Sequence, residues 1–403
     1  MGGVFQQPAK VSDVCDQIRG VSYSGDDAVP KAQDGYLAVL RANNITEEGL
    51  TFDDLTFVPA ARISEKQLVR SGDVVIAASS GSLSVVGKAA PALTDLPMGF
   101  GAFCKVLRPN LKVAPAYFAH YFKTRDYRQK ISSLAAGANI NNLRNEHLDD
   151  LRFPLPPLEE QRRIAAILDQ AETLRTQRRQ ALAHLDTLTQ SLFLDMFGDP
   201  VRNPKGLPRM KLDELIAEGP QNGLYKSSTE YGSGTPILRI DAFYDGVVTK
   251  LNSLKRVRLS PDEIKLFGLA AEDIVINRVN SIEYLGKSAL IPPLSEPTVF
   301  ESNMMRFTVR RDQVEPGYVV HFLQTPFIKG QILSGSKNAV NQSSINQQDV
   351  KGFQINVPPL TLQQTFATRI QAIEALKVTH RTALAQLDAL FASLQQRAFA
   401  GEL

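Results

Sequence analysis

The sequence predicts an α+β protein in which two repeated mixed α/β domains are each followed by a long helix, and the two helices pair as an antiparallel coiled coil. The first observation is a duplicated helix: FPLPPLEEQRRIAAILDQAETLRTQRRQALAHLDTLTQSLF begins at Phe153, and a diverged copy, INVPPLTLQQTFATRIQAIEALKVTHRTALAQLDALFASLQ, begins at Ile355. The second is that short β-branched runs, which favour strands, lie in the segment before each copy. The third is the length of 403 residues, too long for one ordinary core.

The duplication extends through the whole chain. Pro157 aligns with Pro359 at an offset of 202, and the register continues without a gap to Leu192 with Leu394. Upstream, PAYFAHYFKT from Pro115 matches PGYVVHFLQT from Pro316 at an offset of 201. A period near 200 residues indicates two complete domains rather than a solenoid. We therefore expect globular domains at residues 1–152 and 200–354 and helical regions at residues 153–199 and 355–403.

Both globular segments show a mixed pattern. Strands are predicted at DVVIAA from Asp73, FCKVLRP from Phe103, TPILRI from Thr235, EDIVIN from Glu272 and MRFTVRR from Met305. A helix opened by proline is predicted over residues 115–134 and again over residues 316–333. PDEIK from Pro261 is interpreted as the start of a further helix, because its acidic residues favour the first turn.

Each long helix starts after proline and ends near glycine. With Ile164 at heptad position a, apolar residues recur at a and d in both copies, which is typical of a coiled coil. The predicted seam comprises Ile164, Ile167, Ala171, Leu174, Arg178, Leu185, Leu188 and Leu192 in the first helix and Phe366, Ile373, Leu376, His380, Leu387, Leu390 and Leu394 in the second. About 40 residues extend roughly 60 Å as a helix, so each seam needs a partner, and the other copy matches it in length and pattern.

Arg178 and His380 occupy the same central a position in the two copies. A polar residue at a core position can fix the register of a coiled coil, so the pair is a candidate registry device. In the alternative interpretation, the Arg178 side chain simply reaches solvent at a wide point of the seam.

Composition narrows the function classes. The formal net charge is +3, so a nucleic-acid partner would have to meet local basic patches rather than a strongly basic whole. The two cysteines, Cys15 and Cys104, are too few for a disulfide framework and have no metal-like spacing. Apolar runs stay well short of the roughly 20 residues that span a bilayer, and the N-terminal stretch lacks a secretory pattern. A cytoplasmic protein without a membrane partner is expected.

Catalytic motifs are weak throughout. GKS at Gly286 lacks the earlier glycine of a phosphate-binding loop, because Ser281 stands in its place. The LPPL and VPPL stretches lack the flanking residues of an adenine methyltransferase motif, and the five histidines are too scattered for a metal centre. We therefore predict a binding protein with no catalytic residue and no metal site.

Polar loops offer the candidate binding residues. ASSGSLSVVG, GANINNLRNE, NRVNSIEYLG and SGSKNAVNQSSINQQ are rich in Ser, Asn and Gly, and basic and aromatic residues lie near them. Arg and Lys suit phosphates, and Asn, Gln and Arg suit base edges, although a solvated surface is the alternative for any one cluster. The candidates are Arg41, Asn43, Ser79, Ser80, Ser82, Asn139, Asn141 and Asn142 in the first domain and Tyr225, Lys226, Arg239, Asn277, Arg278, Asn280, Asn341 and Gln342 in the second.

The stretch PLPPLEEQRRIAAILD from Pro154 resembles the start of the conserved helical region in specificity subunits of type I restriction-modification enzymes, and the order domain, helix, domain, helix covers all 403 residues as in that family. The second copy departs from the motif, because PPLTLQQ stands where PPLEEQR does in the first. The resemblance implies that each globular segment is a target recognition domain reading one half of a split double-stranded DNA sequence. It also implies that the helical regions set the gap and dock two modification subunits.

The same resemblance implies that the chemistry lies in partner subunits. Modification and restriction subunits would use S-adenosylmethionine, ATP and Mg, and this chain would hold no cofactor. Two alternatives stay open: a coiled-coil scaffold with two protein- or carbohydrate-binding domains, and the recognition subunit of another phage-defence DNA methylation system. Sequence-selective DNA binding and the neighbouring genes distinguish these alternatives.

Overall fold

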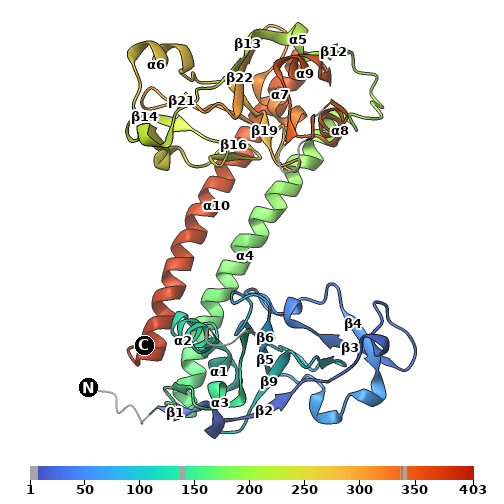
Figure 1. The fold of residues 1–403 in the computed structure, drawn as a ribbon, viewed down its shortest axis with the longest axis vertical. Helices are drawn as coiled ribbons and strands as arrows, with labels where there is room; N and C mark the ends of the chain where they lie inside the picture. Colours follow the sequence, from blue (N-terminus) through green and yellow to red (C-terminus); the bar gives the residue numbers. More distant parts are fainter. Residues whose placement is uncertain (1–7, 136–140, 336, 339–342) are drawn as a thin grey trace. The chain divides into compact units, whose positions relative to one another are not determined.

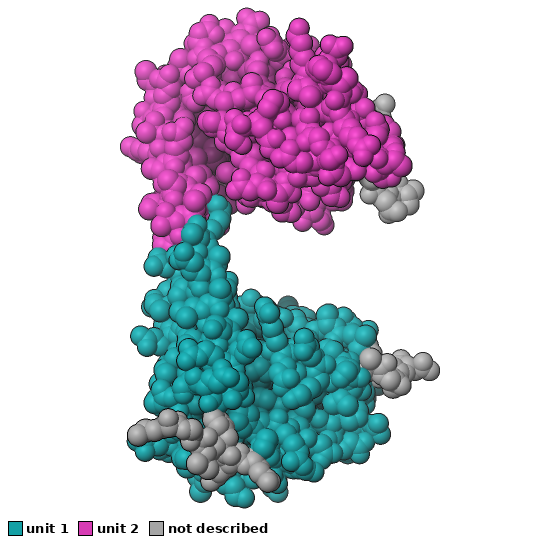
Figure 2. Space-filling model, turned by 90° about the vertical axis from the view of Figure 1, so that its left-hand side faces the viewer, with its two compact units in different colours: residues 1–180, 381–403 teal, residues 181–380 magenta. Residues whose placement is uncertain are grey.

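The computed structural model describes residues 8–135, 141–335, 337–338 and 343–403. The chain divides into two compact units: unit 1 is residues 1–180 with residues 381–403, and unit 2 is residues 181–380 (Figure 2). The two long helices, α4 (Leu158–Phe197) and α10 (Leu360–Ala400), are green and red in Figure 1. Each unit therefore consists of a globular part and a portion of both long helices.

The globular part of unit 1 is built on a four-stranded antiparallel sheet in the order β2-β9-β5-β7. A second sheet has the order β4-β3-β8, and β1 pairs with β11 and β6 with β10. The strands are β1 (Ala9–Lys10), β2 (Cys15–Arg19), β3 (Tyr36–Leu40), β4 (Thr56–Pro59), β5 (Val74–Ala77), β6 (Ser79–Ser80), β7 (Ala89–Pro91), β8 (Gly99–Phe100), β9 (Cys104–Pro109), β10 (Asn141–Asn142) and β11 (Arg152–Phe153). The helices are α1 (Pro115–Tyr121), α2 (Arg125–Ala135) and α3 (Asn145–Asp149).

Strand β5 shows why this sheet forms. Val74 and Ile76 belong to the core shared with α1, α2 and the first turns of α4, whereas Val75 and Ala77 belong to the core under the second sheet. Successive side chains of a strand point to opposite faces, so a strand covered on both faces needs an unbroken apolar run. The run after Asp73 supplies it, and the strand predicted there is confirmed.

Unit 2 repeats this plan with additions. Its main sheet has the order β13-β22-β18-β20-β16-β15, with smaller sheets β17-β14-β21, β12-β25 and β19-β24-β23. Strand β18 takes the place of β5: Ile274 and Ile276 face one core and Val275 the other. The strands are β12 (Arg209–Lys211), β13 (Ile216–Asn222), β14 (Tyr231–Leu238), β15 (Phe243–Tyr244), β16 (Gly246–Val248), β17 (Lys255–Val257), β18 (Ile274–Asn277), β19 (Val279–Asn280), β20 (Ser288–Leu290), β21 (Val299–Phe300), β22 (Met304–Val309), β23 (Lys337–Asn338), β24 (Ser343–Ser344) and β25 (Gln354–Asn356). The helices are α5 (Leu212–Leu215), α6 (Pro261–Phe267), α7 (Pro316–Leu323), α8 (Pro326–Gly335) and α9 (Gln347–Gly352).

Two predicted helices are each broken into two. Residues 115–134 form α1 and α2, and residues 316–333 lie in α7 and α8. At the first break the Thr124 hydroxyl donates to the carbonyl of Tyr121 (2.7 Å) and accepts from the N–H of Tyr127 (3.1 Å). Thr325 makes the equivalent donation, and Pro326 follows it. Threonine side chains compete with the helix backbone and proline starts a new helix, so these local signals outweigh the apolar periodicity.

Helices α4 and α10 run antiparallel. In unit 1, Arg163 bonds the carbonyl of Leu403 and Arg175 bonds Asp388, so moving forward along α4 means moving back along α10. In unit 2, Asp186 pairs with Lys377 and Phe193 packs against Phe366, which gives the same direction. The predicted antiparallel pairing of the two copies is confirmed.

The structure corrects the prediction of which face of each long helix lies in the seam. The predicted d leucines Leu174, Leu188, Leu376 and Leu390 are 44–51% exposed, whereas residues four places after each a position line the seam. Buried seam residues are Ile164, Leu168, Ala171, Phe366, Ile370 and Ile373, and Ile167, Leu185, Leu192, Leu387 and Leu394 are partly buried. Both faces show the same three-four spacing. The globular core decides between them, because it also buries Ala165 and Ala367 beside the a positions.

The centre of the seam also differs from the predicted one. Arg178 is exposed and His380 is partly buried. Arg175 and Lys377, three residues before Arg178 and His380, form short ion pairs between the two helices, and Arg179 adds a longer one to Asp388. These two residues stand at the same position of the repeat, as the offset from Pro157 to Pro359 requires.

Candidate nucleic-acid interface

Two of the polar loops in unit 1 come together as a two-stranded pair. Strand β6 pairs antiparallel with β10, with Asn141 opposite Ser80 and Asn142 opposite Ser79. The backbone extends this pairing, because the N–H of Leu143 donates to the carbonyl of Ala78 at 2.8 Å, and the Leu143 side chain is buried. We call residues 79–80 with 141–142 the polar ribbon of unit 1.

Unit 2 holds the matching pair. Strand β19 pairs antiparallel with β24, with Val279 opposite Ser344 and Asn280 opposite Ser343, and β23 pairs with the other edge of β24. The N–H of Ile345 donates to the carbonyl of Arg278 at 3.0 Å, the counterpart of the bond between Leu143 and Ala78. We call residues 279–280 with 343–344 the polar ribbon of unit 2.

The two ribbons share a backbone and differ in side chains. In unit 1 the N–H groups of Ala78 and Ser79 donate to the carbonyl of Phe103, and in unit 2 those of Arg278 and Val279 donate to the carbonyl of Asn303. Across the ribbons the pairs at equivalent places are Ser79 with Val279, Ser80 with Asn280, Asn141 with Ser343 and Asn142 with Ser344. The fold therefore places different residues on one backbone scaffold, and in unit 2 Val279 is apolar and Ser343 is buried.

Two of the predicted arginines, Arg41 and Arg239, lie on a different sheet from the ribbons. Arg41 follows β3 and Arg239 follows β14, at equivalent ends of the smaller sheets. Both are engaged within their own unit: Arg41 bonds the Asp54 carboxylate at 2.8 Å, and Arg239 bonds Glu301 at 3.0 Å. Asn43 also donates to Asp54, at 3.3 Å.

The remaining candidates of unit 2 fall into two groups. Tyr225 is 80% exposed, and its neighbour Lys226 bridges Glu230 and Glu263, so the pKa of Lys226 is raised above its usual range by these hydrogen bonds. Asn277 is fully buried, and Arg278 donates to the carbonyl of Ser302 at 3.1 Å. Asn277 is corrected from a surface contact to a core residue behind the ribbon, because strand β18 ends inside the core.

Ser82 and the loop tips complete the predicted set. The Ser82 hydroxyl is exposed and shares a hydrogen bond with Ser84 at 2.8 Å. Asn139, Asn341 and Gln342 lie outside the described residues. The structure thus unites the serines and asparagines of the ribbons and separates them from Arg41, Arg239 and Tyr225.

Sequence reasoning missed two features of the polar surface, one beside the unit 1 ribbon and one near Arg239, where Lys287 donates to the carbonyl of Ile240 at 2.6 Å. Phe103, whose carbonyl anchors the unit 1 ribbon, has a side chain that is 68% exposed. Lys287 lies 3.8 Å from the ring centre of Tyr244 and 5.6 Å from that of Tyr284, and burial lowers its pKa to about 8. Lys287 belongs to the GKS triplet, so the recurrence of GK in both repeats was the available signal.

The glycine of this recurring GK has a packing role. Gly87 and Gly286 have φ of +77° and +78°, a conformation that other residues rarely adopt. A Cβ atom added to Gly87 would lie 2.2 Å from Ile131, and one added to Gly286 would lie 2.1 Å from Ile332. The motif recurs because a helix packs closely on this turn in each unit.

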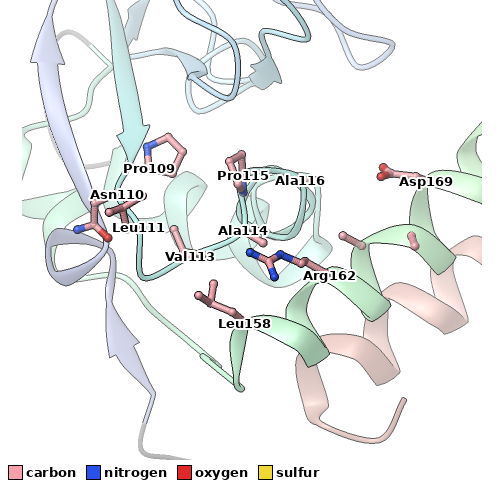
Figure 3. A pocket seen from close by; sticks show the side chains of 12 residues that line it. Pro109, Asn110, Leu111, Val113, Ala114, Pro115, Ala116, Leu158, Arg162 and Asp169 are labelled. Atoms are coloured by element: carbon pink, nitrogen blue, oxygen red, sulfur yellow. The ribbon is translucent and has the colours of Figure 1, made fainter.

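A surface hollow of about 620 Å³ lies where α4 begins in unit 1 (Figure 3). Its wall from the globular part is mainly apolar and includes Leu111, Val113 and Pro115. Leu158, Arg162 and Asp169 come from α4, and the Arg162 side chain extends from that helix toward the loop (Figure 3). The hollow suits an apolar contact with a charged edge.

The described part of the chain also bears on metal-binding and membrane-spanning sites. There, no group of three or more His, Cys, Asp or Glu side chains is placed to hold a metal ion. No helix within the described ranges is long and apolar enough to cross a membrane.

Known proteins share this architecture. The family model described as "Type I restriction modification DNA specificity domain" matches residues 7–184 and again residues 206–389. The chain is 34% identical to the type I restriction enzyme EcoKI specificity subunit of Escherichia coli K12 over 98% of this chain and 88% of that protein. It is 32% identical to the StySPI specificity subunit of Salmonella potsdam, with the same coverage.

A solved structure has the same fold. The crystal structure of a type I restriction-modification S subunit from M. genitalium superposes with a TM-score of 0.61 at 13% identity, covering 99% of this chain and 97% of that one. The solved structure supports the fold, and the family assignment rests on the two matched domains and on the relatives above 30% identity. The chain belongs to the specificity subunits of type I restriction-modification enzymes and carries two target recognition domains.

Proposed function

We propose that this specificity subunit directs a type I complex to a bipartite double-stranded DNA sequence, with each target recognition domain reading one half. The observation that carries the proposal is the pair of polar ribbons, which share a backbone scaffold and differ in side chains. A single scaffold used twice suits one kind of ligand. Different side chains at equivalent places suit two different half-sites.

The chemistry of the ribbons suits base edges. The major groove admits a two-stranded ribbon, and Asn and Ser side chains can hydrogen-bond to adenine and to other base edges there. Asn142, Asn280 and Ser344 lie outside the hydrophobic cores that hold the ribbons in place. We assign base contacts to the ribbons and phosphate contacts to Arg41, Asn43, Tyr225, Lys226 and Arg239. The ion pairs that Arg41, Lys226 and Arg239 make within their own units would be exchanged for phosphates on binding.

The long helices are proposed to set the gap and to dock modification subunits. In unit 1, Leu174 and Leu390 are half exposed at the same heptad position, one on each helix, and in unit 2 Leu188 and Leu376 repeat this arrangement. In an antiparallel pair, the same flank of both helices faces one side, so each unit presents a pair of leucines to a partner. Two equivalent leucine pairs suit two copies of one modification subunit.

The reaction itself is assigned to the partners. We propose that this chain is non-catalytic, that modification subunits bind S-adenosylmethionine, and that restriction subunits use ATP and Mg. The complex would act in the cytoplasm, where its DNA target lies. Support comes from the two relatives that are 34% and 32% identical over nearly the whole chain, both of which are specificity subunits.

The test is long-read methylation mapping of a host that lacks its own methylation and expresses this chain with its modification subunit. Modified adenines in a two-part motif with one fixed gap are expected. A stable complex that creates no new motif would contradict the proposal and favour a scaffold whose domains bind protein or carbohydrate. If the chain belongs to another phage-defence methylation system, the same kind of motif is expected, and the partner genes would differ.

A further inference from the structure

One basic residue in each unit occupies the middle of the helix seam. In unit 1, Arg175 bonds Glu172 on its own helix and Asp388 on the other helix, at 2.6 Å to the latter. Arg179 adds longer contacts to the same two acids, at 3.4 Å to Asp388 and 3.7 Å to Glu172. In unit 2, Lys377 bonds Glu374 on its own helix at 2.7 Å and Asp186 on the other helix at 2.9 Å. We call each set of a cation and two acids a clasp.

The two clasps are copies of one device. Adding the repeat offset of 202 to Glu172, Arg175 and Asp186 gives Glu374, Lys377 and Asp388. Eleven residues separate Arg175 from Asp186 along α4, and eleven separate Lys377 from Asp388 along α10. Because the helices are antiparallel, these equal separations let both clasps close in one and the same register.

Both cations are more buried than those of a typical surface ion pair. The Lys377 side chain is only 3% exposed, and that of Arg175 is 16% exposed. Burial works to lower the pKa of Lys377, but the hydrogen bonds to Asp186 and Glu374 outweigh it, so the pKa is raised and the residue stays charged. The Arg175 guanidinium also lies 4.4 Å from the ring centre of Phe391. A charge kept at a seam position favours one arrangement over others more than it adds stability.

Neighbouring registers are unfavourable for both clasps. Sliding α10 by one heptad in one direction would set Arg381 against Arg175 and Arg179 against Lys377. Sliding it the other way would set Gln395 against Arg175 and Phe193 against Lys377, leaving each cation without its acid from the other helix. Like charges repel and an unpaired buried charge is costly, so the registers on both sides of the native one are disfavoured. The apolar heptads alone do not discriminate in this way, since leucine and alanine recur at each step.

We propose that Arg175 and Lys377, each with its acid from the opposite helix, select the register in which α4 and α10 pair. The consequence for DNA, that the clasps hold the gap between half-sites to one length, rests on the proposed function above. Aromatic contacts such as Phe399 with Tyr117 in unit 1 and Phe197 with Tyr318 in unit 2 join the helix ends to the globular parts. The clasps act on the seam between these ends.

The register can be measured in the full-length chain with cysteine pairs and a short bis-maleimide. Leu174→Cys with Leu390→Cys reports the native register, and Leu174→Cys with Ala383→Cys or with Arg397→Cys reports a slip of one heptad, about 10 Å. The native Cys15 and Cys104 are buried and have a pKa raised to about 12 by burial, so they react slowly. The unaltered clasps should give native cross-links alone.

The test variant is Arg175→Leu with Lys377→Leu and Arg179→Gln, the last of which also removes the longer contact of Arg179 to Asp388. We expect an unchanged or raised melting temperature, a several-fold loss of the native cross-link and the appearance of a slipped one. The matched control is Leu182→Ala with Leu384→Ala, two seam residues related by the same offset, which should lower the melting temperature and keep the native register. Exchanging the cations, Arg175→Lys with Lys377→Arg, should also keep it. Native cross-links alone in the leucine variant would overturn the proposal.

A second variant covers the case in which the first does not fold. Asp388→Ala, Arg381→Asp, Asp186→Ala and Arg179→Asp together keep both cations and move the opposing acids by one heptad. The slipped cross-link should then dominate, and a native cross-link would contradict the proposal. Methylation mapping of the complex distinguishes failure of the proposed function from failure of the link between clasp and gap. If the chain with unaltered clasps creates no bipartite motif, the proposed function is wrong. If a variant with a slipped register still creates one motif with the native gap, the link from clasp to gap is wrong.

Discussion

Gln161 and Gln363 make the same three hydrogen bonds in their own units. The Gln161 side-chain oxygen accepts from the N–H of Ala114 at 2.8 Å, and that of Gln363 accepts from the N–H of Glu315 at 2.9 Å. Their amide nitrogens donate to the carbonyls of Pro156 and Pro358, each at 2.7 Å, and more weakly to a residue of the preceding loop. Each glutamine is almost fully buried and ties a long helix to the helix that starts beside it.

Gln161→Leu and Gln363→Leu should each destabilise the chain by about 1–3 kcal/mol, because a buried backbone N–H loses its partner and cannot reach water. Urea unfolding of the full-length chain measures the change. Gln170→Leu and Gln371→Leu, at exposed positions of the same helices, are the controls and should shift the unfolding free energy by less than about 0.5 kcal/mol. If the changes at the buried and the exposed glutamines shifted the unfolding free energy equally, the hydrogen bonds of Gln161 and Gln363 would not contribute to stability.

These glutamines also explain which part of the duplicated motif is retained. The acidic pair Glu159 and Glu160 becomes Thr361 and Leu362 in the second copy, whereas the glutamine stays. The acids lie on the outside of the first turn, where the helix dipole favours them without requiring them. Only the glutamine satisfies a buried backbone group, so the departure of PPLTLQQ from PPLEEQR leaves the junction intact.

His321 predicts an acid-sensitive unit 2. Burial, and then the nearby charge of Lys377, lowers its pKa to about 4, so the folded state holds the ring neutral. Between about pH 6.5 and pH 4 the unfolded chain binds a proton that the folded chain does not, so stability falls as the pH falls through this window. The full effect is at most about 3 kcal/mol. Above pH 6.5 the residue has no such effect.

The measurement compares urea unfolding of the unaltered chain and of His321→Gln at pH 7.5 and pH 4.5. The difference in unfolding free energy between the two pH values should be smaller in the variant by about 2–3 kcal/mol, since most of the titration lies above pH 4.5. His184→Gln replaces an exposed imidazole on α4 and should leave the difference unchanged. Identical pH dependence in the unaltered chain and in His321→Gln would rule out this role.

The leucines outside the seam predict how many partners assemble. Leu174→Glu with Leu390→Glu should remove one modification subunit from the complex, because a charge at a buried apolar contact is costly. Leu188→Glu with Leu376→Glu should remove the other, and the four changes together should remove both. Native mass spectrometry of the co-expressed complex counts the subunits. The control is Gln177→Glu with Gln386→Glu, at exposed positions of the same helices, which should leave the number of modification subunits unchanged. An unchanged number in the leucine variants would show that the leucines do not contact a modification subunit.

Much of the fold is predictable from the sequence because its signals are local or repeated. The offset between Pro157 and Pro359 reveals the duplication, and the apolar run after Asp73 reveals a strand buried on both faces. The pairing of the two long helices follows because each has a seam that needs a partner of equal length and pattern, whereas their antiparallel direction is what the family resemblance implies. The exact face does not follow, since Leu174 and Leu168 both continue a three-four pattern and only the domain core selects Leu168.

The candidate site is less predictable because it depends on contacts between distant residues. Ser80 and Asn141 lie opposite each other on the two strands of one ribbon, although 60 residues separate them in the sequence. Composition alone identifies both only as polar residues. Asn277 has the same composition signal as Asn280, yet it lies at the buried end of β18. Burial in a particular core separates a supporting residue from a contact residue, and periodicity carries no such information at the end of a strand.

The polar ribbons predict that the two half-sites can be altered independently. Ser80→Ala with Asn142→Ala should weaken discrimination in one half-site, and Asn280→Ala with Ser344→Ala should weaken it in the other. Each lost bidentate contact to a base is worth about 1–3 kcal/mol, or roughly 5- to 150-fold in preference for the correct base. Methylation of plasmids that carry every single-base change of the target measures this preference at each position.

The matched control is Ser133→Ala with Ser334→Ala, serines on α2 and α8 that are related by an offset of 201 and bond only to their own helices. This control should leave every position of both half-sites unchanged. Loss of preference in both halves from a change in one ribbon would mean that the ribbon supports the complex as a whole. Because the ribbons belong to different units with separate cores, loss confined to one half is expected, and the half affected identifies which domain reads it.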